Sequence, residues 1–185
     1  MRPRLVMLDR DGVLNVDRRD SVKTPDELVM LPHAASAVAR LNQAGVKVAL
    51  ISNQSVVGRG IISSDMLENI QNKLRDFLVR DGARLDFVAI CTDPPWAATE
   101  RRKPGDAMLR EAIRRFSLSP YEAVMIGDSL GDLQAAAKAG CSRILVRSGK
   151  GVATQAAGIP AQLLPVTVRA DLRDAVAHLL GEEES

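Results

Sequence analysis

The chain has 185 residues, and 25 Lys and Arg against 23 Asp and Glu leave a formal net charge of +2. This length suits about one domain with a sizeable core, so we expect a single domain over residues 1–185. The near-neutral charge and the small number of aromatic residues argue against nucleic-acid binding. No apolar stretch approaches the roughly twenty residues of a membrane span, so we expect a cytoplasmic monomer with no membrane partner.

The two cysteines, Cys91 and Cys141, lie far apart in the sequence. Two cysteines cannot build a disulfide framework, and their spacing does not match a structural zinc site. We therefore expect both to be buried free thiols, which behave as small apolar side chains.

The first half of the chain alternates short apolar runs with helical patterns. Residues 5–8 predict a buried strand, residues 32–44 a helix, and residues 46–51 a second buried strand. The serines at 63–64 are suitable caps for a long helix over residues 65–80, whose apolar residues form one stripe.

The second half continues the alternation. The expected elements, in chain order, are a strand at 85–91, a helix at 105–116, a strand at 123–126, a helix at 130–139, a strand at 144–146, a loop at 148–151, a surface connection at 155–165 and a helix at 170–180. Strands that alternate with helices over the whole length predict an α/β fold, with a doubly wound, mainly parallel sheet and helices on both faces.

Polar residues follow the predicted strands at the point where each strand ends. They are Asp9 and Asp11 after the first strand, Ser52, Asn53, Gln54 and Ser55 after the second, Arg102 and Lys103 in the segment after the third, and Asp128 and Ser129 after the fourth. Ligands bind outside the carboxyl ends of the strands in such sheets. We therefore expect acids, hydroxyls, amides and cationic side chains to meet at one edge.

This combination of groups suits phosphoryl transfer. Asp9 and Asp11 are one residue apart, so their carboxylates can face one pocket, and like charges so close are best tolerated around a hard cation such as Mg²⁺. Lys and Ser side chains stabilise charge on phosphoryl oxygens. One Asp can attack phosphorus to form an aspartyl phosphate that water cleaves, while a second Asp handles the proton.

These residues resemble the four motifs of the haloacid dehalogenase superfamily of phosphatases. The matching features, in order, are DRDGVLN after a hydrophobic strand, Ser52, Lys103 before a helix, and GDSLGD at 127–132. Finer matches at SNQSVVGRG, RRKPGDAM and VRSGKG resemble the D-glycero-D-manno-heptose 1,7-bisphosphate phosphatase group, which also includes histidinol-phosphate phosphatases. The likeness runs from residue 5 to about residue 151.

The resemblance implies a role for each matched residue. It implies Asp9 as nucleophile, Asp11 as general acid and base, and Ser52 and Lys103 as stabilisers of the phosphoryl group. It implies that Mg²⁺ is held by Asp9, Asp128 and the backbone carbonyl of Asp11. It implies substrate contacts at Asp17, Asn53, Gln54, Ser55, Arg102 and Ser129. The short segments between the motifs leave no room for a large cap domain.

The connection after the third strand departs from the group's pattern. Members often carry a zinc-holding loop of cysteines and a histidine there, whereas Cys91 is followed by TDPPWAATERRKP without either residue. We therefore expect no zinc, and we expect the loop to be held by packing of Pro94, Pro95 and Trp96.

Two further departures remove positive charge. Gly105 and Asp106 stand where the group usually has a second Lys-Pro, and Ser129 stands where Lys is common. Two cations that could bind a second phosphate are therefore missing from these positions.

We expect a Mg²⁺-dependent phosphomonoester hydrolase that forms an aspartyl phosphate and acts on a small sugar phosphate, with the heptose bisphosphate as the leading substrate. Histidinol phosphate or another small phosphorylated metabolite is the alternative among enzymes. A non-catalytic phosphate-binding scaffold is a second alternative, and the presence of both Asp9 and Asp11 argues against it.

Overall fold

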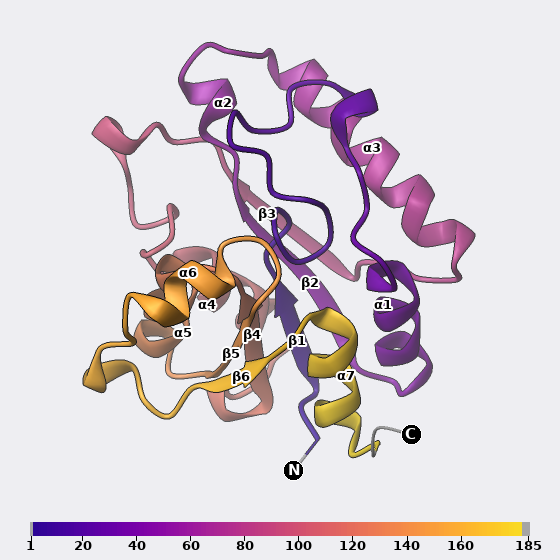
Figure 1. Ribbon diagram of the computed structural model, residues 1–185, viewed down its shortest axis with the longest axis vertical. Coiled ribbons are helices and arrows are strands. Elements are labelled where there is room, and N and C mark those ends of the chain that lie inside the picture. The colour runs from indigo at the N-terminus through magenta and orange to yellow at the C-terminus, as the bar shows by residue number, and fades with distance from the viewer. Residues whose placement is uncertain (1, 183–185) are drawn as a thin grey trace.

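A six-stranded parallel sheet organises the computed structural model, which describes residues 2–182 (Figure 1). Its order is β3-β2-β1-β4-β5-β6, and every neighbouring pair is parallel. The strands are β1 (Leu5–Leu8), β2 (Lys47–Asn53), β3 (Phe87–Cys91), β4 (Ala123–Gly127), β5 (Ser142–Val146) and β6 (Thr167–Arg169).

Helices cover both faces of this sheet. They are α1 (Ala34–Gln43), α2 (Ser55–Gly58), α3 (Ser64–Arg80), α4 (Ala107–Arg115), α5 (Leu130–Ala139), α6 (Gly151–Ala156) and α7 (Leu172–Leu180). Buried residues of α1, α3 and α7 belong to one apolar cluster, and those of α4 and α5 belong to another. The predicted doubly wound α/β fold is confirmed.

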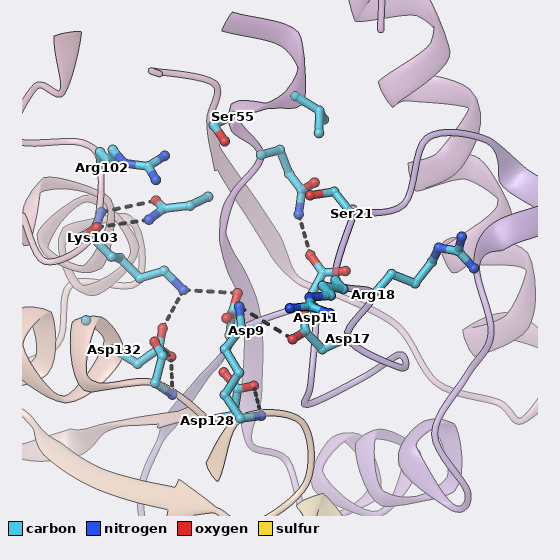
Figure 2. A pocket seen from close by; sticks show the side chains of 17 residues that line it. Asp9, Asp11, Asp17, Arg18, Ser21, Ser55, Arg102, Lys103, Asp128 and Asp132 are labelled. Carbon is cyan, nitrogen blue, oxygen red and sulfur yellow. Dashed lines mark hydrogen bonds and ion pairs between the residues drawn. The ribbon is translucent and has the colours of Figure 1, made fainter. Parts of the chain in front are cut away.

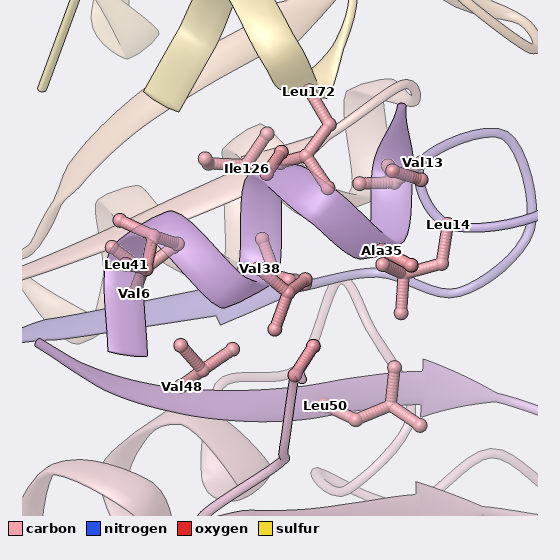
Figure 3. Packing of buried hydrophobic residues seen from close by; sticks show 14 of the residues in the cluster. Val6, Val13, Leu14, Ala35, Val38, Leu41, Val48, Leu50, Ile126 and Leu172 are labelled. Carbon is pink, nitrogen blue, oxygen red and sulfur yellow. The ribbon is translucent and has the colours of Figure 1, made fainter. Parts of the chain in front are cut away.

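The buried side chains of β1 show how the sheet separates the two clusters. All four residues of β1 are completely buried, and successive side chains of a strand point to opposite faces. Val6 and Leu8 pack in the cluster with α1, α3 and α7, whereas Leu5 and Met7 pack in the cluster with α4 and α5. Figure 3 shows Val6 in the first cluster, beside α1. A strand that is apolar on both faces is the sequence pattern of a parallel sheet with two covered faces.

The order of the strands determines where along the carboxyl edge of the sheet a ligand is expected to bind. The chain leaves β1 toward β2 and β3 on one side, and β4, β5 and β6 follow on the other side of β1. The connections after β1 and β4 therefore diverge, and ligands of open α/β sheets bind in the crevice at such a switch point. Asp9 and Asp128 directly follow these two strands.

The predicted elements agree with the structure except at short segments. Ser63 caps α3 by accepting a hydrogen bond from the backbone N–H of Met66, as expected. The helices α2 and α6 and the strand β6 were not predicted, because four, six and three residues are too few for a periodic pattern.

The prediction of a surface connection at 155–165 is only partly correct, because Leu163 in this segment is buried against Leu133 and Leu145.

Both cysteines are free and buried, as predicted. Across residues 2–182, the structure contains no helix with the length and apolar character needed to span a bilayer.

Candidate active site

A cavity of about 520 Å³ opens at the carboxyl edge of the sheet, as the switch point predicts (Figure 2). The predicted site residues that line it are Asp9, Asp11, Asp17, Asn53, Gln54, Ser55, Arg102, Lys103, Asp128 and Ser129. Ser52 does not line the cavity: its side chain is completely buried, and its hydroxyl accepts a hydrogen bond from Gln54 Nε2 at 2.9 Å.

Lys103 is the cationic centre of the site. Its Nζ lies 3.0 Å from Asp9 Oδ1 and 2.6 Å from Asp132 Oδ1, and it donates to the carbonyl oxygen of Ile51 at 2.8 Å. The side chains of Lys103 and Asp132 are 3% and 0% exposed, so the ion pair is shielded from water. Burial favours the neutral amine, but Asp132 and Asp9 outweigh it and raise the pKa of Lys103. Lys103 is therefore a fixed positive charge next to Asp9.

Asn53 holds the backbone of Lys103 in place. Asn53 Nδ2 donates to the carbonyl oxygen of Lys103 at 2.9 Å, and the backbone N–H of Lys103 donates to Asn53 Oδ1 at 3.1 Å. This pair of hydrogen bonds joins the end of β2 to the segment before α4. Both strand order and these contacts thus determine where the ammonium group lies.

The carboxylate of Asp11 is held by three donors. Asp11 Oδ1 accepts from Asn15 Nδ2 at 2.9 Å and from Arg10 Nη2 at 3.1 Å, and Asp11 Oδ2 accepts from Gln54 Nε2 at 2.7 Å. Burial acts to raise the pKa of Asp11, but the charge of Arg10 and these hydrogen bonds hold it below its ordinary value. Asp11 is therefore an oriented carboxylate in the ligand-free site.

Asp128 is enclosed by two glycines from distant parts of the chain. A Cβ atom at Gly12 would lie 2.1 Å from Asp128 Oδ2, and one at Gly149 would lie 2.2 Å from the same atom. Both glycines have positive φ, which L side chains rarely adopt. The backbone N–H of Lys150 donates to Asp128 Oδ2 at 2.8 Å. Side chains at either glycine would displace the carboxylate.

Three acids of this site, Asp9, Asp128 and Asp132, lie close together, and Lys103 contacts two of them. Burial and the nearby acids raise the pKa of Asp9 from 3.8 to about 7, although Lys103 opposes the rise. Burial is also the main reason why the pKa of Asp128 rises to about 6. Buried carboxylates that lie close together favour their protonated forms, so the charged forms of Asp9 and Asp128 are disfavoured when no cation is bound between them.

The same acids have the donor atoms that a hard cation needs. One carboxylate oxygen from each of Asp9, Asp128 and Asp132 lies within 4.8 Å of the others. Oxygen is the donor that Mg²⁺ prefers, and a divalent cation would offset the negative charge of these acids. Asp132 already pairs with Lys103 and accepts from Ser129 Oγ at 2.6 Å. Asp9 and Asp128 are therefore the carboxylates that fit a magnesium ion.

The predicted packing of the loop after β3 is wrong. Trp96 is 74% exposed, and Pro95 is exposed as well. Hydrogen bonds hold the loop instead: Thr99 donates to Asp93 from its backbone and its hydroxyl, at 2.9 and 2.6 Å. Arg102 Nη1 donates to the carbonyl oxygen of Asp93 at 2.9 Å, which brings this side chain to the cavity wall.

Several lining or supporting residues escaped the sequence analysis. Asp132 has the motif of a helix cap, so its buried pair with Lys103 is visible only in three dimensions. Arg10 is completely buried although charged residues are mostly exposed. Arg18, Arg19 and Lys150 also line the cavity and supply positive charge. Asp132, Arg10 and Lys150 lie in the quoted segments GDSLGD, DRDGVLN and VRSGKG, whereas Arg18 and Arg19 lie in no matched motif.

The parallel sheet, together with the carboxylates and the lysine at its carboxyl edge, defines a phosphatase of the α/β class. The chain belongs in particular to the haloacid dehalogenase-like hydrolases, whose family model matches residues 3–140. The predicted superfamily and enzyme class are confirmed.

Relatives with assigned names agree with this family. A D-glycero-beta-D-manno-heptose-1,7-bisphosphate 7-phosphatase of Pseudomonas aeruginosa is 38% identical over 156 residues, which cover 84% of this chain and 88% of the relative. The corresponding protein of Bordetella bronchiseptica is 41% identical over 155 residues, which cover 84% of this chain and 87% of the relative.

A solved structure of the same kind is similar over nearly the whole chain. The crystal structure of D,D-heptose 1,7-bisphosphate phosphatase from B. bronchiseptica, complexed with magnesium and phosphate, has a TM-score of 0.92 and 39% sequence identity. The match covers 97% of this chain and 99% of that chain.

Proposed function

We propose that this chain hydrolyses the 7-phosphate of D-glycero-D-manno-heptose 1,7-bisphosphate in a Mg²⁺-dependent reaction. The observation that carries the proposal is the contact of Lys103 Nζ with Asp9 Oδ1 at 3.0 Å, beside Asp128 at the switch point of the sheet. A nucleophilic carboxylate next to a fixed cation is what transfer of a phosphoryl group requires. The named relatives add the identity of the sugar.

Asp9 is the proposed nucleophile. Arg10 donates its backbone N–H to Asp9 Oδ1 at 2.7 Å, and Lys103 contacts the same oxygen, which fixes the carboxylate and leaves Oδ2 as the attacking atom. Asp9, Asp128 and the backbone carbonyl of Asp11 would hold Mg²⁺. When bound, this ion supplies positive charge that offsets the carboxylates and the phosphoryl oxygens. Lys103 stabilises the charge on the phosphoryl group from the other side. The buried Ser52 hydroxyl acts indirectly, because it accepts a hydrogen bond from the Gln54 amide that contacts Asp11.

Asp11 is the proposed general acid and base. Its pKa is held below its ordinary value in the ligand-free site, so Asp11 is ionised there, and the ionised form is the one that can accept a proton from water in the second step. A phosphate dianion that binds beside it adds negative charge and raises its pKa, so that it gains the proton it gives to the leaving oxygen.

The wall of the cavity provides the proposed substrate contacts. Asn53 and Ser55 follow β2, Arg102 follows β3, Ser129 follows β4, and Asp17 lies in the segment after β1. Arg18 and Arg19 also line the wall and bring positive charge for a second phosphate, which Gly105, Asp106 and Ser129 do not supply.

The proposal is tested by phosphate release with Mg²⁺ from the heptose bisphosphate, histidinol phosphate and other small sugar phosphates. We expect the highest kcat/KM for the heptose bisphosphate and heptose 1-phosphate as the product. Equal low rates on every ester would refute the proposal that the heptose bisphosphate is the substrate. Asp9→Asn should abolish release, and full release by this variant would refute the mechanism.

Histidinol phosphate remains the alternative substrate. The charges at Arg102, Arg18 and Arg19 favour a compound with two phosphates over one that carries a cationic amine. The scaffold alternative predicts binding without turnover, so the same assay decides it.

We also propose a single-domain monomer that acts in the cytoplasm on a small metabolite, not on nucleic acid or membranes. One sheet joins strands from residue 5 to residue 169, and the net charge is +2. We propose that no zinc is bound, because Cys91 is the one cysteine next to the loop that holds zinc in similar proteins. Light scattering and metal analysis of the purified protein test these points.

A further inference from the structure

Lys150, which has no role in the proposed function, forms an ion pair with Asp17 on the cavity wall. Lys150 Nζ lies 3.4 Å from Asp17 Oδ2, and both residues line the cavity. Asp17 belongs to the segment after β1 and Lys150 to the segment after β5, so the pair spans the end of β4. Figure 2 shows Asp17 close to Asp11 and Asp9.

The backbone of Lys150 is fixed to the floor of the site. Its N–H donates to Asp128 Oδ2 at 2.8 Å, and Thr154 Oγ1 donates to the carbonyl oxygen of Asp128 at 2.8 Å. Ser148 Oγ donates to the carbonyl oxygen of Gly12 at 2.6 Å. The Lys150 side chain is 66% exposed and so accessible to a ligand, whereas that of its partner Asp17 is 18% exposed. The backbone of Lys150 is therefore held in a defined position, while its side chain lies in the open cavity.

The chemistry of the pair selects what it can bind. A phosphate placed on the ammonium of Lys150 would lie next to the carboxylate of Asp17, and the two negative groups would repel each other. A hydroxyl group both donates and accepts, so it can donate to Asp17 and accept from Lys150 at the same time. Hydrogen bonds to charged groups are the stronger ones, which makes such a pair selective for hydroxylated ligands.

We propose that Asp17 and Lys150 bind a hydroxyl group of the sugar, and that this pair is the reason for a preference for polyhydroxylated phosphates. The inference rests on the proposed function, because it supposes that the substrate is a sugar phosphate. It adds Lys150 as a specificity-determining residue, and it assigns Asp17 to the sugar and not to either phosphate.

The test compares two ligands that differ only in their hydroxyl groups and related ring atoms. D-glycero-D-manno-heptose 1,7-bisphosphate and 1,7-heptanediol bisphosphate carry the same two phosphates on a seven-carbon chain. Binding is measured by calorimetry with Mg²⁺ in the Asp9→Asn background, where the ligand is not consumed. We expect Lys150→Met to weaken binding of the sugar about tenfold more than binding of the diol bisphosphate. Lys138→Met, at the exposed far end of α5, is the matched control.

A second variant separates binding from loop attachment. Asp17→Asn keeps an acceptor for a hydroxyl but removes the ion pair, so it should retain more sugar binding than Asp17→Ala. Equal losses in these two variants would show that the pair only joins the two segments. Equal weakening of both ligands by Lys150→Met would show that Lys150 binds phosphate. Either result overturns the inference while the phosphatase function stands. Loss of phosphate release by the unaltered chain would instead refute the proposed function.

Discussion

Asp9→Asn should stabilise the metal-free protein at alkaline pH although it removes the proposed nucleophile. The side chain of Asp9 is 15% exposed, and its pKa in the folded chain is about 7 against an ordinary value of 3.8. Between these values the folded state keeps a proton that the unfolded state releases. The stability that Asp9 contributes is thus complete below pH 4 and is lost as the pH rises through 7. The difference corresponds to ~4 kcal/mol at about 1.4 kcal/mol per pKa unit.

Asn is a suitable replacement because its Oδ1 can still accept from the backbone N–H of Arg10 and from Lys103. Urea unfolding followed by circular dichroism in chelator should therefore show Asp9→Asn more stable than the unaltered chain by about 2 to 4 kcal/mol at pH 8. The advantage should nearly vanish at pH 4. Asp76→Asn makes the same chemical change at an exposed position of α3 and serves as control.

Saturating Mg²⁺ should make the unaltered chain more stable than Asp9→Asn, because the ion stabilises the state that binds it. If Asp9→Asn were no more stable than the unaltered chain at pH 8 in chelator, the argument from buried negative charge would be refuted.

Three further changes test other parts of the structure. Asp132→Asn removes one partner of a buried ion pair with Lys103, so it should cost about 3 kcal/mol of unfolding free energy and lower kcat by about 10²-fold, measured by urea unfolding and phosphate release. Gly12→Ala should weaken Mg²⁺ binding at least about tenfold in calorimetry, because the new Cβ meets Asp128. Gly82→Ala, which has a similar φ of +72° and nothing within 4 Å, should leave Mg²⁺ binding unchanged. Leu74→Ala in the buried face of α3 should cost about 2 to 5 kcal/mol, and a cost below 1 kcal/mol would contradict the packing described.

The sequence was sufficient for the features whose signal is local. The apolar runs at 5–8 and 123–126 predict strands and place Asp9 and Asp128 at one edge. The convergence of Lys103 on that edge follows from the parallel order of strands, which the alternation of elements already implies. These residues were predicted because each lies directly beside a regular element.

The rest depends on partners that are distant in the chain. Asp132 has the sequence context of a helix cap, and only the approach of Lys103 gives it a buried charge partner. The absence of further Cys or His in the loop after β3 predicts that packing of Trp96 holds it, yet the loop is held by polar contacts of Asp93. The strand β6 is too short to show periodicity and exists because β5 offers it an edge.

The contact between Gly12 and the segment 148–151 determines when the site can become functional during synthesis. Ser148 binds the carbonyl oxygen of Gly12 across 136 positions of the chain, and Gly149 encloses Asp128 together with Gly12. Asp9, the proposed nucleophile, is synthesised well before β5, and the enclosure of Asp128 waits until β5 and its following turn have left the ribosome. Of the residues that enclose Asp128, Gly149 lies outside residues 3–140, the part matched by the family model. A nascent chain that ends before residue 148 would carry every residue proposed for the chemistry and would lack an ordered carboxylate at Asp128.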